Sequence, residues 1–287
     1  MLFLENLNNK NQDSFAKLLC KSKKLQYRLD FNAFYENKSF IMKFIVKKYV
    51  KLIKKDELFV GFIWLDYFQD KSVHVKQFFI LDEYIKYINH DFFEKLNNST
   101  ILLEEYEDHF TREITKNAIM LKIKETKLLK LDYHKKLNID FKDSVEFYKF
   151  NKRKDERARC YIQNKVFDNY DRIPLTVSDI QFDTKQEYFL DDLCYFILVN
   201  KEVAGYGQII YSRGMYSVVN FGIIKEYRNK GYAIQLLNKL CLEARNKGIN
   251  DVYIRVDKNN IKALNLYKKV GFEYIGNIST WIWNRIG

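Results

Sequence analysis

Apolar residues follow two patterns along the chain, and together they predict a mixed α/β fold. Alternating or continuous apolar runs predict strands, whereas apolar positions three or four residues apart predict helices. In the first half, Tyr49–Ile53 and Leu58–Tyr67 are separated by a polar turn and predict a hairpin. The expected elements of this half are helices over 2–35, 82–96 and 111–121 and strands over 40–49, 49–53, 58–67, 73–81, 101–106 and 128–133.

The second half repeats this order of elements. Gly248 follows the helix predicted over 232–247 and has the position of a C-terminal cap. The expected elements are helices over 156–167, 177–182, 232–247 and 261–270 and strands over 145–150, 193–199, 203–211, 216–224, 252–256 and 274–283.

The two halves also share residues that are separated by nearly the same offset along the chain. Phe78–Tyr84 and Phe221–Tyr227 have the same pattern F-x-I-x-x-E-Y, and Gly61 and Gly205 both fall in predicted hairpins. A common order of elements with a common offset indicates an internal duplication. We therefore expect two domains, residues 1–137 and 138–287.

Length and charge fit this division. The 287 residues are sufficient for two domains of ordinary size. The net charge of +12 divides evenly, with +6 in residues 1–137 and +6 in the rest. Nucleic-acid binders more often concentrate positive charge on one face or arm. We therefore expect a solvated, Lys-rich surface and no nucleic-acid partner.

Other features bear on compartment and cofactor class. The four cysteines are far apart and form no C-x-x-C pair, which is unfavourable for a disulfide or a metal site and fits a reducing compartment. The N-terminus reaches a charge at Glu5, unlike a signal peptide. The longest apolar run, Leu58–Leu65, is far shorter than the ~20 residues of a membrane span. We expect a cytoplasmic protein with no metal and no membrane partner.

The segment Arg228–Ala233, with the pattern R-x-x-G-x-A, lies between a predicted strand and a predicted helix. The first N–H groups of a helix have no internal acceptors, and they lie at the positive end of the helix dipole, where a pyrophosphate can bind. Gly231 would let a phosphate approach the backbone, and Ala233 is small. The alternative is an ordinary helix start that has a glycine in its loop.

A second segment runs from Asn260 to Phe272 with the pattern N-x-x-A-x-x-x-Y-x-x-x-G-F. Ala263 and Tyr267 are four residues apart and share one helix face. Simpler interpretations stay open: Asn260 as a helix cap and Tyr267 as an amphipathic core residue.

In this order and spacing, the two segments resemble the GNAT acetyltransferases. The resemblance covers about Asp143 to Ile286, and the first half resembles the same fold only in outline. It implies a tandem GNAT protein of mixed α/β class, in which each domain is a twisted, mostly antiparallel sheet flanked by helices. The first domain would be degenerate and non-catalytic.

The resemblance also implies acetyl-CoA, or a related acyl-CoA, as donor. By similarity, backbone atoms of two strand residues would bind the pantetheine arm, the turn would hold the pyrophosphate, Asn260 would meet the pantetheine or thioester end, and Tyr267 would be the general acid. The expected cofactor-binding residues are Ile223, Ile224, Arg228, Asn229, Lys230, Gly231, Tyr232, Ala233, Asn260 and Ala263. Tyrosine suits the acid role because its pKa of about 10 leaves it protonated at neutral pH.

Two departures from the family pattern matter. Many members carry a glutamate as general base on the strand before the turn, but Val219 and Asn220 stand at the matching positions. The base could be a water chain, a residue elsewhere, or nothing if the amine arrives neutral. In the first half, Ile85–His90 replaces the turn, with isoleucines at the aligned Arg and Gly positions. We therefore predict that this half does not bind CoA in the usual manner.

The leading hypothesis is an N-acetyltransferase that transfers acetyl from acetyl-CoA to a primary amine of a small molecule or peptide by direct attack. A tandem aminoacyl or long-chain acyl transferase is a second possibility. A catalytically idle CoA-binding regulatory module is a third, since the glutamate is missing. The sequence leaves open the acceptor and the choice between monomer and homodimer.

Overall fold

The computed structural model describes residues 1–22, 31–36, 38–67, 72–131, 141–168 and 172–285. The chain divides into two compact units, which we describe separately. Unit 1 contains residues 1–126 together with 276–287, and unit 2 contains residues 127–275. None of the described helices has the length and apolar character needed to cross a bilayer.

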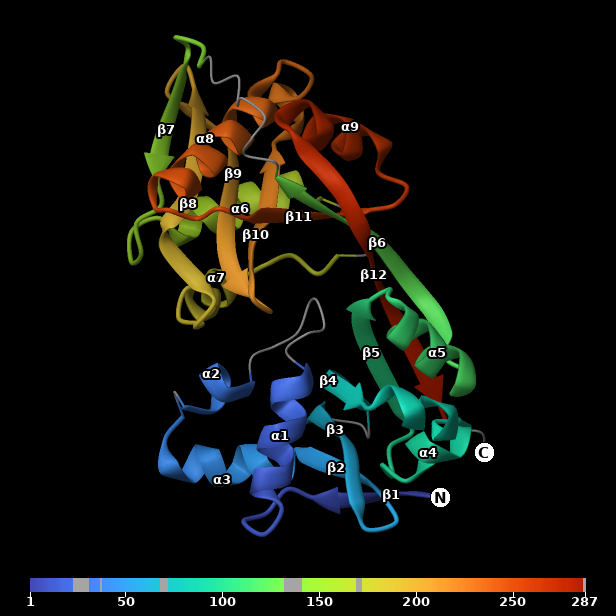
Figure 1. The fold of residues 1–287 in the computed structure, drawn as a ribbon. Coiled ribbons are helices and arrows are strands. Elements are labelled where there is room, and N and C mark those ends of the chain that lie inside the picture. Colours follow the sequence, from blue (N-terminus) through green and yellow to red (C-terminus); the bar gives the residue numbers. More distant parts are fainter. Residues whose placement is uncertain (23–30, 37, 68–71, 132–140, 169–171, 286–287) are drawn as a thin grey trace. The chain divides into compact units, whose positions relative to one another are not determined.

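Unit 1 is built around a sheet whose hydrogen-bonded order is β1-β2-β3-β4-β5-β12 (Figure 1). The pair β4–β5 is parallel, and the other four pairs are antiparallel. The elements are β1 (Leu2–Asn6), α1 (Gln12–Ser22), α2 (Phe31–Glu36), α3 (Phe40–Lys48), β2 (Val50–Lys55), β3 (Leu58–Tyr67), β4 (Ser72–Ile80), the 3-10 helix η1 (Asp82–Tyr87), α4 (His90–Glu94), β5 (Thr100–Tyr106), α5 (His109–Asn117), the start of β6 (Leu121–Leu131) and most of β12 (Phe272–Asn284).

Unit 2 has a sheet of the same kind, in the order β7-β8-β9-β10-β11-β6. The pair β10–β11 is parallel, and β7 to β10 are antiparallel. The elements are the end of β6, β7 (Val145–Lys149), α6 (Glu156–Val166), α7 (Val177–Asp183), β8 (Phe189–Val199), β9 (Glu202–Ser212), β10 (Met215–Ile223), the 3-10 helix η2 (Lys225–Tyr227), α8 (Tyr232–Asn246), β11 (Val252–Asp257), α9 (Ile261–Val270) and the start of β12. The expected fold class, a mostly antiparallel mixed sheet flanked by helices, is confirmed.

Each sheet has a core on both faces, because successive strand residues point to opposite sides. In unit 2, Tyr195 and Ile197 belong to a core that includes α8 and α9. Cys194 and Phe196, on the other face of the same strand, belong to a core that includes Ile162 of α6. The two faces of unit 1 are filled in the same way by two further clusters.

The same close backbone approach recurs in both units and supports the duplication. Gly61 lies opposite Ile80, and Gly205 lies opposite Ile223. A Cβ atom on Gly61 would be 2.4 Å from the carbonyl oxygen of Phe79, and one on Gly205 would be 2.5 Å from the carbonyl oxygen of Gly222. Both contacts are too short for any side chain, so each hairpin requires glycine at this point.

The last strand of each repeat begins in its own unit and ends in the unit of the other repeat. Residues 127–131 of β6 belong to unit 2, and residues 276–284 of β12 belong to unit 1, where β12 pairs with β5. Within unit 1, the Thr126 hydroxyl donates a 2.9 Å hydrogen bond to the carbonyl of Ile278. The expected boundary at 137/138 falls outside the described residues, and the roles assigned to domains 1–137 and 138–287 stay predictions.

Several predicted elements of the first half are wrong in type or extent; for example, the strand expected over 128–133 begins at Leu121. Residues 2–6 form a strand paired with β2 instead of the start of a long helix. Residues 40–48 form helix α3 instead of a strand, because the Ser39 hydroxyl caps it by accepting a bond from the Met42 amide. The expected helix 82–96 is broken into η1 and a five-residue α4, because Ile88 is extended and Asn89 caps a new helix.

Candidate functional site

The candidate site in unit 2 begins at a bulge in β10. The register of the pairing between β10 and β9 shifts by one residue between Val219 and Gly222, and Asn220 has a positive φ of 51°. Beyond Val218, β10 no longer pairs with β11, because the parallel register covers Tyr216–Val218 alone. The residues of the bulge are half-buried although β10 is an inner strand. The end of β10 therefore presents a backbone edge that a neighbouring strand does not cover.

Ile223 and Ile224, the two strand residues expected to bind the pantetheine arm, differ in whether their backbone amides can still donate a hydrogen bond. The amide of Ile224 already donates to Ala204 O at 2.9 Å, on the β9 side. Successive residues of a strand alternate in direction, so the amide of Ile223 faces away from β9. The carbonyl of Ile223 accepts the Nε of Arg228. The Ile223 amide is thus the donor available to an extended ligand.

The turn after β10 is shaped as an anion-binding backbone. Asn229 and Gly231 both have positive φ, at 61° and 86°, and Gly231 is the N-cap residue of the 15-residue helix α8. The amides of residues 229–233 have no acceptor among the described residues. Successive N–H groups in such a conformation, at the positive end of a long helix, form a concave site for an anion.

Arg228 braces this turn. Its Nε donates to Ile223 O at 2.8 Å, and its Nη2 donates to Val166 O at 2.9 Å, at the end of α6. The nearby Lys230 ammonium donates to Glu226 O at 3.3 Å. Both cations are exposed and add positive charge next to the five amides.

Lys142 is a residue of the turn that sequence reasoning missed. Its ammonium donates to Lys230 O at 2.9 Å and lies 3.8 Å from the position that a Cβ of Gly231 would occupy. It also lies 5.4 Å from the ring centre of Tyr232. A single lysine 88 residues before Lys230, in a chain rich in lysine, leaves no local signal of this contact.

Tyr267 lies on α9 and reaches the bulge through an aromatic contact. Its ring centre is 6.3 Å from that of Phe221, the residue after Asn220, and 6.3 Å from that of Phe272. The side chain is 8% exposed, and its hydroxyl makes no hydrogen bond to a described residue. Burial raises the pKa of Tyr267 to about 12. At neutral pH this hydroxyl is protonated and can donate.

Asn260 and Ala263 meet each other at the start of α9. The side chain of Asn260 is the N-cap and accepts a 3.1 Å bond from the Ala263 amide. This geometry matches the simpler interpretation of Asn260 as a cap. A contact of either residue with a cofactor stays a prediction.

A polar cluster lies under α6, on the other face of the sheet. Arg159 is 1% exposed, pairs with Asp183 of α7 and lies within 5.6 Å of three aromatic ring centres. Its Nε and Nη1 have no partner among the described residues. The same holds for the Nε2 atoms of Gln163 and Gln208, and Gln208 pairs with Val219 next to the bulge.

The corresponding segment of unit 1 has the opposite character. Ile85 and Ile88, which align with Arg228 and Gly231, are 7% and 1% exposed and belong to the core. The Asn89 side chain accepts from the Phe92 amide at 3.1 Å, so this donor of the short helix α4 is already occupied. These features support the prediction that this half does not hold a pyrophosphate.

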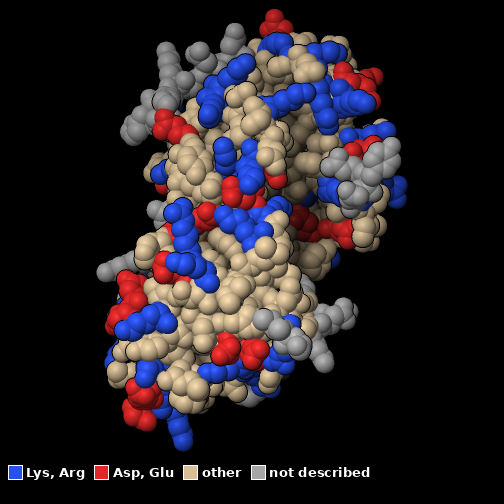
Figure 2. All heavy atoms as spheres, turned by 90° about the vertical axis from the view of Figure 1, so that its right-hand side faces the viewer, with Lys and Arg blue, Asp and Glu red and all other residues tan. Residues whose placement is uncertain are grey.

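Charge on the surface is dispersed. On the face drawn in Figure 2, Lys and Arg side chains occur over both units with Asp and Glu between them. This face has no single broad field of positive charge. The expectation of no nucleic-acid partner stays a prediction.

Comparison with known sequences identifies one family model and several similar proteins. Residues 155–272 match the sequence model of the Acetyltransferase (GNAT) family. The chain is 30% identical over 82 residues to the uncharacterized N-acetyltransferase YobR of Bacillus subtilis (strain 168), a match that covers 28% of this chain and 33% of YobR. It is 36% identical over 58 residues to the chloroplastic GCN5-related N-acetyltransferase 6 of Arabidopsis thaliana, covering 20% of each chain. The chain thus spans about a third or less of these relatives.

Solved structures extend the likeness of fold to the whole chain. A GCN5-related N-acetyltransferase from Sphaerobacter thermophilus superposes with a TM-score of 0.68 at 12% identity, covering 100% of this chain and 96% of the other. A tandem GNAT protein from the clavulanic acid biosynthesis pathway has a TM-score of 0.66 at 9% identity, covering 99% and 98%. At these identities the likeness concerns the fold alone.

Proposed function

We propose that unit 2, in which residues 155–272 match the sequence model of the GNAT acetyltransferase family, transfers an acetyl group from acetyl-CoA to a primary amine of a small molecule or peptide. The observation that carries this proposal is the turn at the start of α8, where five amides, those of residues 229–233, have no acceptor within the ranges that the structure describes. A cytoplasmic location is part of the proposal.

The residues of unit 2 fit a CoA ester. The amides of the turn would bind the pyrophosphate, and the Lys142 ammonium beside them would add a charge that the sequence did not reveal. Arg228 would act mainly by holding the turn in shape, since two backbone carbonyls already occupy its guanidinium. The Ile223 amide would bind the pantetheine arm along the uncovered edge of β10. When bound, acetyl-CoA supplies an activated thioester.

Tyr267 would act on the leaving sulfur. With a pKa of about 12, it keeps its proton throughout the neutral range and is a hydrogen-bond donor, never a base. Its contact with Phe221 places it beside the bulge. There its hydroxyl would stabilise negative charge on the thiolate as the carbon–sulfur bond breaks and the amine nitrogen bonds to the acyl carbon.

Val219 and Asn220 cannot accept a proton, so the bulge itself contains no general base. We propose that the amine enters neutral, after losing its proton to solvent. The dependence of kcat/KM on pH should then rise until the pKa of the acceptor amine is reached. A break well below that pKa would indicate a base within the protein.

Two other functions remain as proposals of lower rank. The missing glutamate favours an idle CoA-binding regulatory module. The two-unit architecture also fits an aminoacyl or long-chain acyl transferase, but the intact turn favours CoA over a tRNA-borne donor.

Isothermal titration of the full chain with acetyl-CoA tests the donor, with Gly231→Val as the matched control. Micromolar binding that Gly231→Val abolishes is expected, and no binding would refute the proposal. A panel of amines with detection of released thiol then tests turnover. Binding without turnover on any amine would favour the regulatory module.

A further inference from the structure

A cleft of about 660 Å³ in unit 1 lies between the 3-10 helix η1 and helix α5. Its volume is within the roughly 300–1,000 Å³ typical of ligand pockets. The side-chain amide of Asn117, at the end of α5, donates to Ile85 O of η1 at 3.4 Å and links the two elements. The lining residues are Asp82, Ile85, Lys86, Asp108, His109, Phe110, Glu113 and Asn117.

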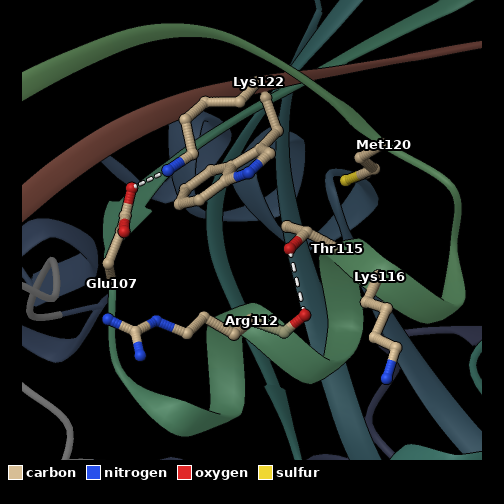
Figure 3. Close-up of a pocket in the computed structure, with 7 residues that line it drawn as sticks. Glu107, Arg112, Thr115, Lys116, Met120 and Lys122 are labelled. Atoms are coloured by element: carbon tan, nitrogen blue, oxygen red, sulfur yellow. Dashed lines mark hydrogen bonds and ion pairs between the residues drawn. The ribbon is translucent and has the colours of Figure 1, made fainter.

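Helix α5 also lines a second cavity, and the cations of the helix lie on that side. Arg112 and Lys116 line the second cavity together with Trp281, and neither lines the cleft. Figure 3 shows this second cavity, with Arg112 on the side of Glu107 and Glu107 paired with Lys122. The charges of the second cavity are thus partly neutralised among themselves, and its cations do not enter the cleft.

Two carboxylates of the cleft have no partner among the described residues. Asp82 begins η1 and Glu113 lies in the middle of α5, and neither side chain makes an ion pair or a hydrogen bond there. A third carboxylate, that of Asp108, is occupied as the N-cap of α5. The ammonium of Lys86 lies 5.3 Å from the ring centre of Tyr87, which is outside the lining. The cleft therefore has two free negative charges, one on each of the elements that flank it.

The equivalent positions of unit 2 carry the opposite charge. The matching segments Phe78–Tyr84 and Phe221–Tyr227 align η1 with η2. The N-caps Asp108 and Asn260 align α5 with α9, since each accepts the amide three residues further on. The cleft has three acids and one lysine, whereas the equivalent positions contain four cations and no acid: Lys225, Arg228, Asn229, Asn260, Ile261, Lys262, Asn265 and Lys269. The cleft of unit 1 thus repels the polyanion proposed for unit 2 and attracts a cation.

The cleft also has an apolar part of its lining. Ile85 and Phe110 are 7% and 8% exposed and belong to the core of the unit. Ring contacts with Phe78 and Phe79, at centre distances of 6.3 and 6.4 Å, hold Phe110 in place. An alkyl chain can displace water from these side chains, whereas a bare metal ion cannot.

We propose that this cleft binds an organic diamine, a cation with two ammonium groups joined by an alkyl chain. Its ammonium groups pair with Asp82 on η1 and Glu113 on α5, and its chain covers Ile85 and Phe110. Two free carboxylates on separate elements favour a ligand with two charges, because a single ammonium would leave one acid unpaired. The site is separate from the proposed donor site of unit 2, so its failure would leave the proposed acetyl transfer untouched.

Titration calorimetry of the full chain, in an amine-free buffer at fixed ionic strength, tests the two parts of this recognition. We expect 1,4-diaminobutane to bind. The diol 1,4-butanediol, which has the same chain without the charges, should bind at least ten-fold more weakly. Magnesium ion, which has the same charge without the chain, should also bind at least ten-fold more weakly. Equal binding of the diol or of magnesium, or no binding of the diamine, would overturn the proposal.

Two variants locate the diamine. D82N/E113Q removes both free carboxylates and should lower the affinity for 1,4-diaminobutane ten-fold or more. The control D56N/E57Q removes the same charge from the turn between β2 and β3 of the same unit and should bind like the parent. An unchanged affinity in D82N/E113Q, or an equal loss in the control, would contradict the assignment.

A measurement on the parent chain does not depend on any variant of the cleft acids. The imidazole C–H proton signal of His109, assigned by comparison with His109→Gln, should move as 1,4-diaminobutane is added. The signal of His74, on β4 and outside the lining, should stay in place. A titration that moves both signals equally, or neither, would refute binding in this cleft.

Discussion

The turns that follow β4 and β10 occupy equivalent places in the two units, yet the turn after β10 is exposed and the turn after β4 is filled by core side chains. After β10, Gly231 in a left-handed conformation starts a 15-residue helix, and the amides of 229–233 have no acceptor in the described part of the chain. After β4, Ile85 and Ile88 point into the core, and Asn89 caps a helix of five residues. The two turns thus differ in backbone conformation, in the length of the helix that follows and in whether side chains fill the place beside their amides.

The cores under the first helices differ as well. Under α1, Phe15, Phe31 and Trp64 pack ring against ring in edge contacts. Under α6, a comparable ring cluster surrounds the guanidinium of Arg159, which Asp183 partly neutralises. Unit 1 also buries polar side chains, for example Gln77, which donates to the Ser22 hydroxyl at 3.1 Å, but at the place of the Arg159 guanidinium it has an aromatic ring.

The largest effect should come from blocking the open turn. Gly231→Val forces a β-branched residue to φ +86° and places methyl groups beside the amides, so affinity for acetyl-CoA should fall at least hundred-fold. Calorimetry gives the affinity, and the melting temperature checks the fold. Ile88→Val at the aligned position should leave the affinity unchanged. Equal losses in both variants would break the asymmetry between the units.

Removing the acid of the buried pair should destabilise the protein next most. Asp183→Asn leaves the Arg159 charge without its partner and should lower the free energy of unfolding by roughly 2 kcal/mol. This is less than for a fully buried pair, because the Asp183 side chain is 21% exposed. Urea unfolding measures the change. The double variant Arg159→Met/Asp183→Asn should recover most of it, and a double variant no better than the single one would contradict a role for charge.

Tyr267→Phe should lower kcat ten-fold or more with little change in KM, since it removes a donor that acts on the leaving thiolate. Tyr161→Phe, on the exposed side of α6, is the matched control. Steady-state kinetics with the amine found by the panel gives both constants. An unchanged kcat would remove Tyr267 from the mechanism.

The pKa of Tyr267 also determines how the reaction rate should depend on pH. Burial disfavours the phenolate, so Tyr267 keeps its proton to higher pH than a free tyrosine, with a pKa of about 12. Between pH 7 and 10 the rate should therefore show no falling limb due to this group. A decline of activity that begins near pH 9 and disappears in Tyr267→Phe would mean that its pKa is not raised.

The smallest effect concerns the charge beside the turn. Lys142→Gln should weaken acetyl-CoA binding about five-fold, because its exposed ammonium is one contribution among several and is screened by salt. The difference from the parent should shrink as ionic strength rises. Lys86→Gln, in the closed turn of unit 1, should have no effect. A larger loss for Lys86→Gln would place the cofactor in the wrong unit.

Local patterns predicted the second half well. Each element there has a short-range signal in the sequence. Alternating apolar residues mark the hairpin of β8 and β9, a glycine marks the turn at Gly231, and a period near 3.6 marks the helices over 232–247 and 261–270. The strand predicted over Phe40–Lys48 is wrong. The aromatic and β-branched residues of this segment favour a strand, but the Ser39 cap and tertiary packing stabilise a helix.

Contacts between distant residues could not be predicted. Lys142 reaches Lys230 across 88 residues, and Arg159 finds Asp183 and three rings in a core that no periodicity announces. In a chain with 49 Lys and Arg residues, a single lysine or arginine is expected to lie on the solvated surface. The sequence therefore predicts the turn with Arg228 and Lys230, but not the contact of Lys142 with this turn or the burial of Arg159.

The exchange of β6 and β12 has a consequence for how the protein is made. During synthesis from the N-terminus, β5 emerges early, but its partner strand at residues 278–284 emerges only after all of unit 2. Unit 2, in contrast, already has β6 waiting when β11 appears. Unit 1 is thus synthesised first but completed last. The edge of β5 stays unpaired until residues 278–284 have been synthesised.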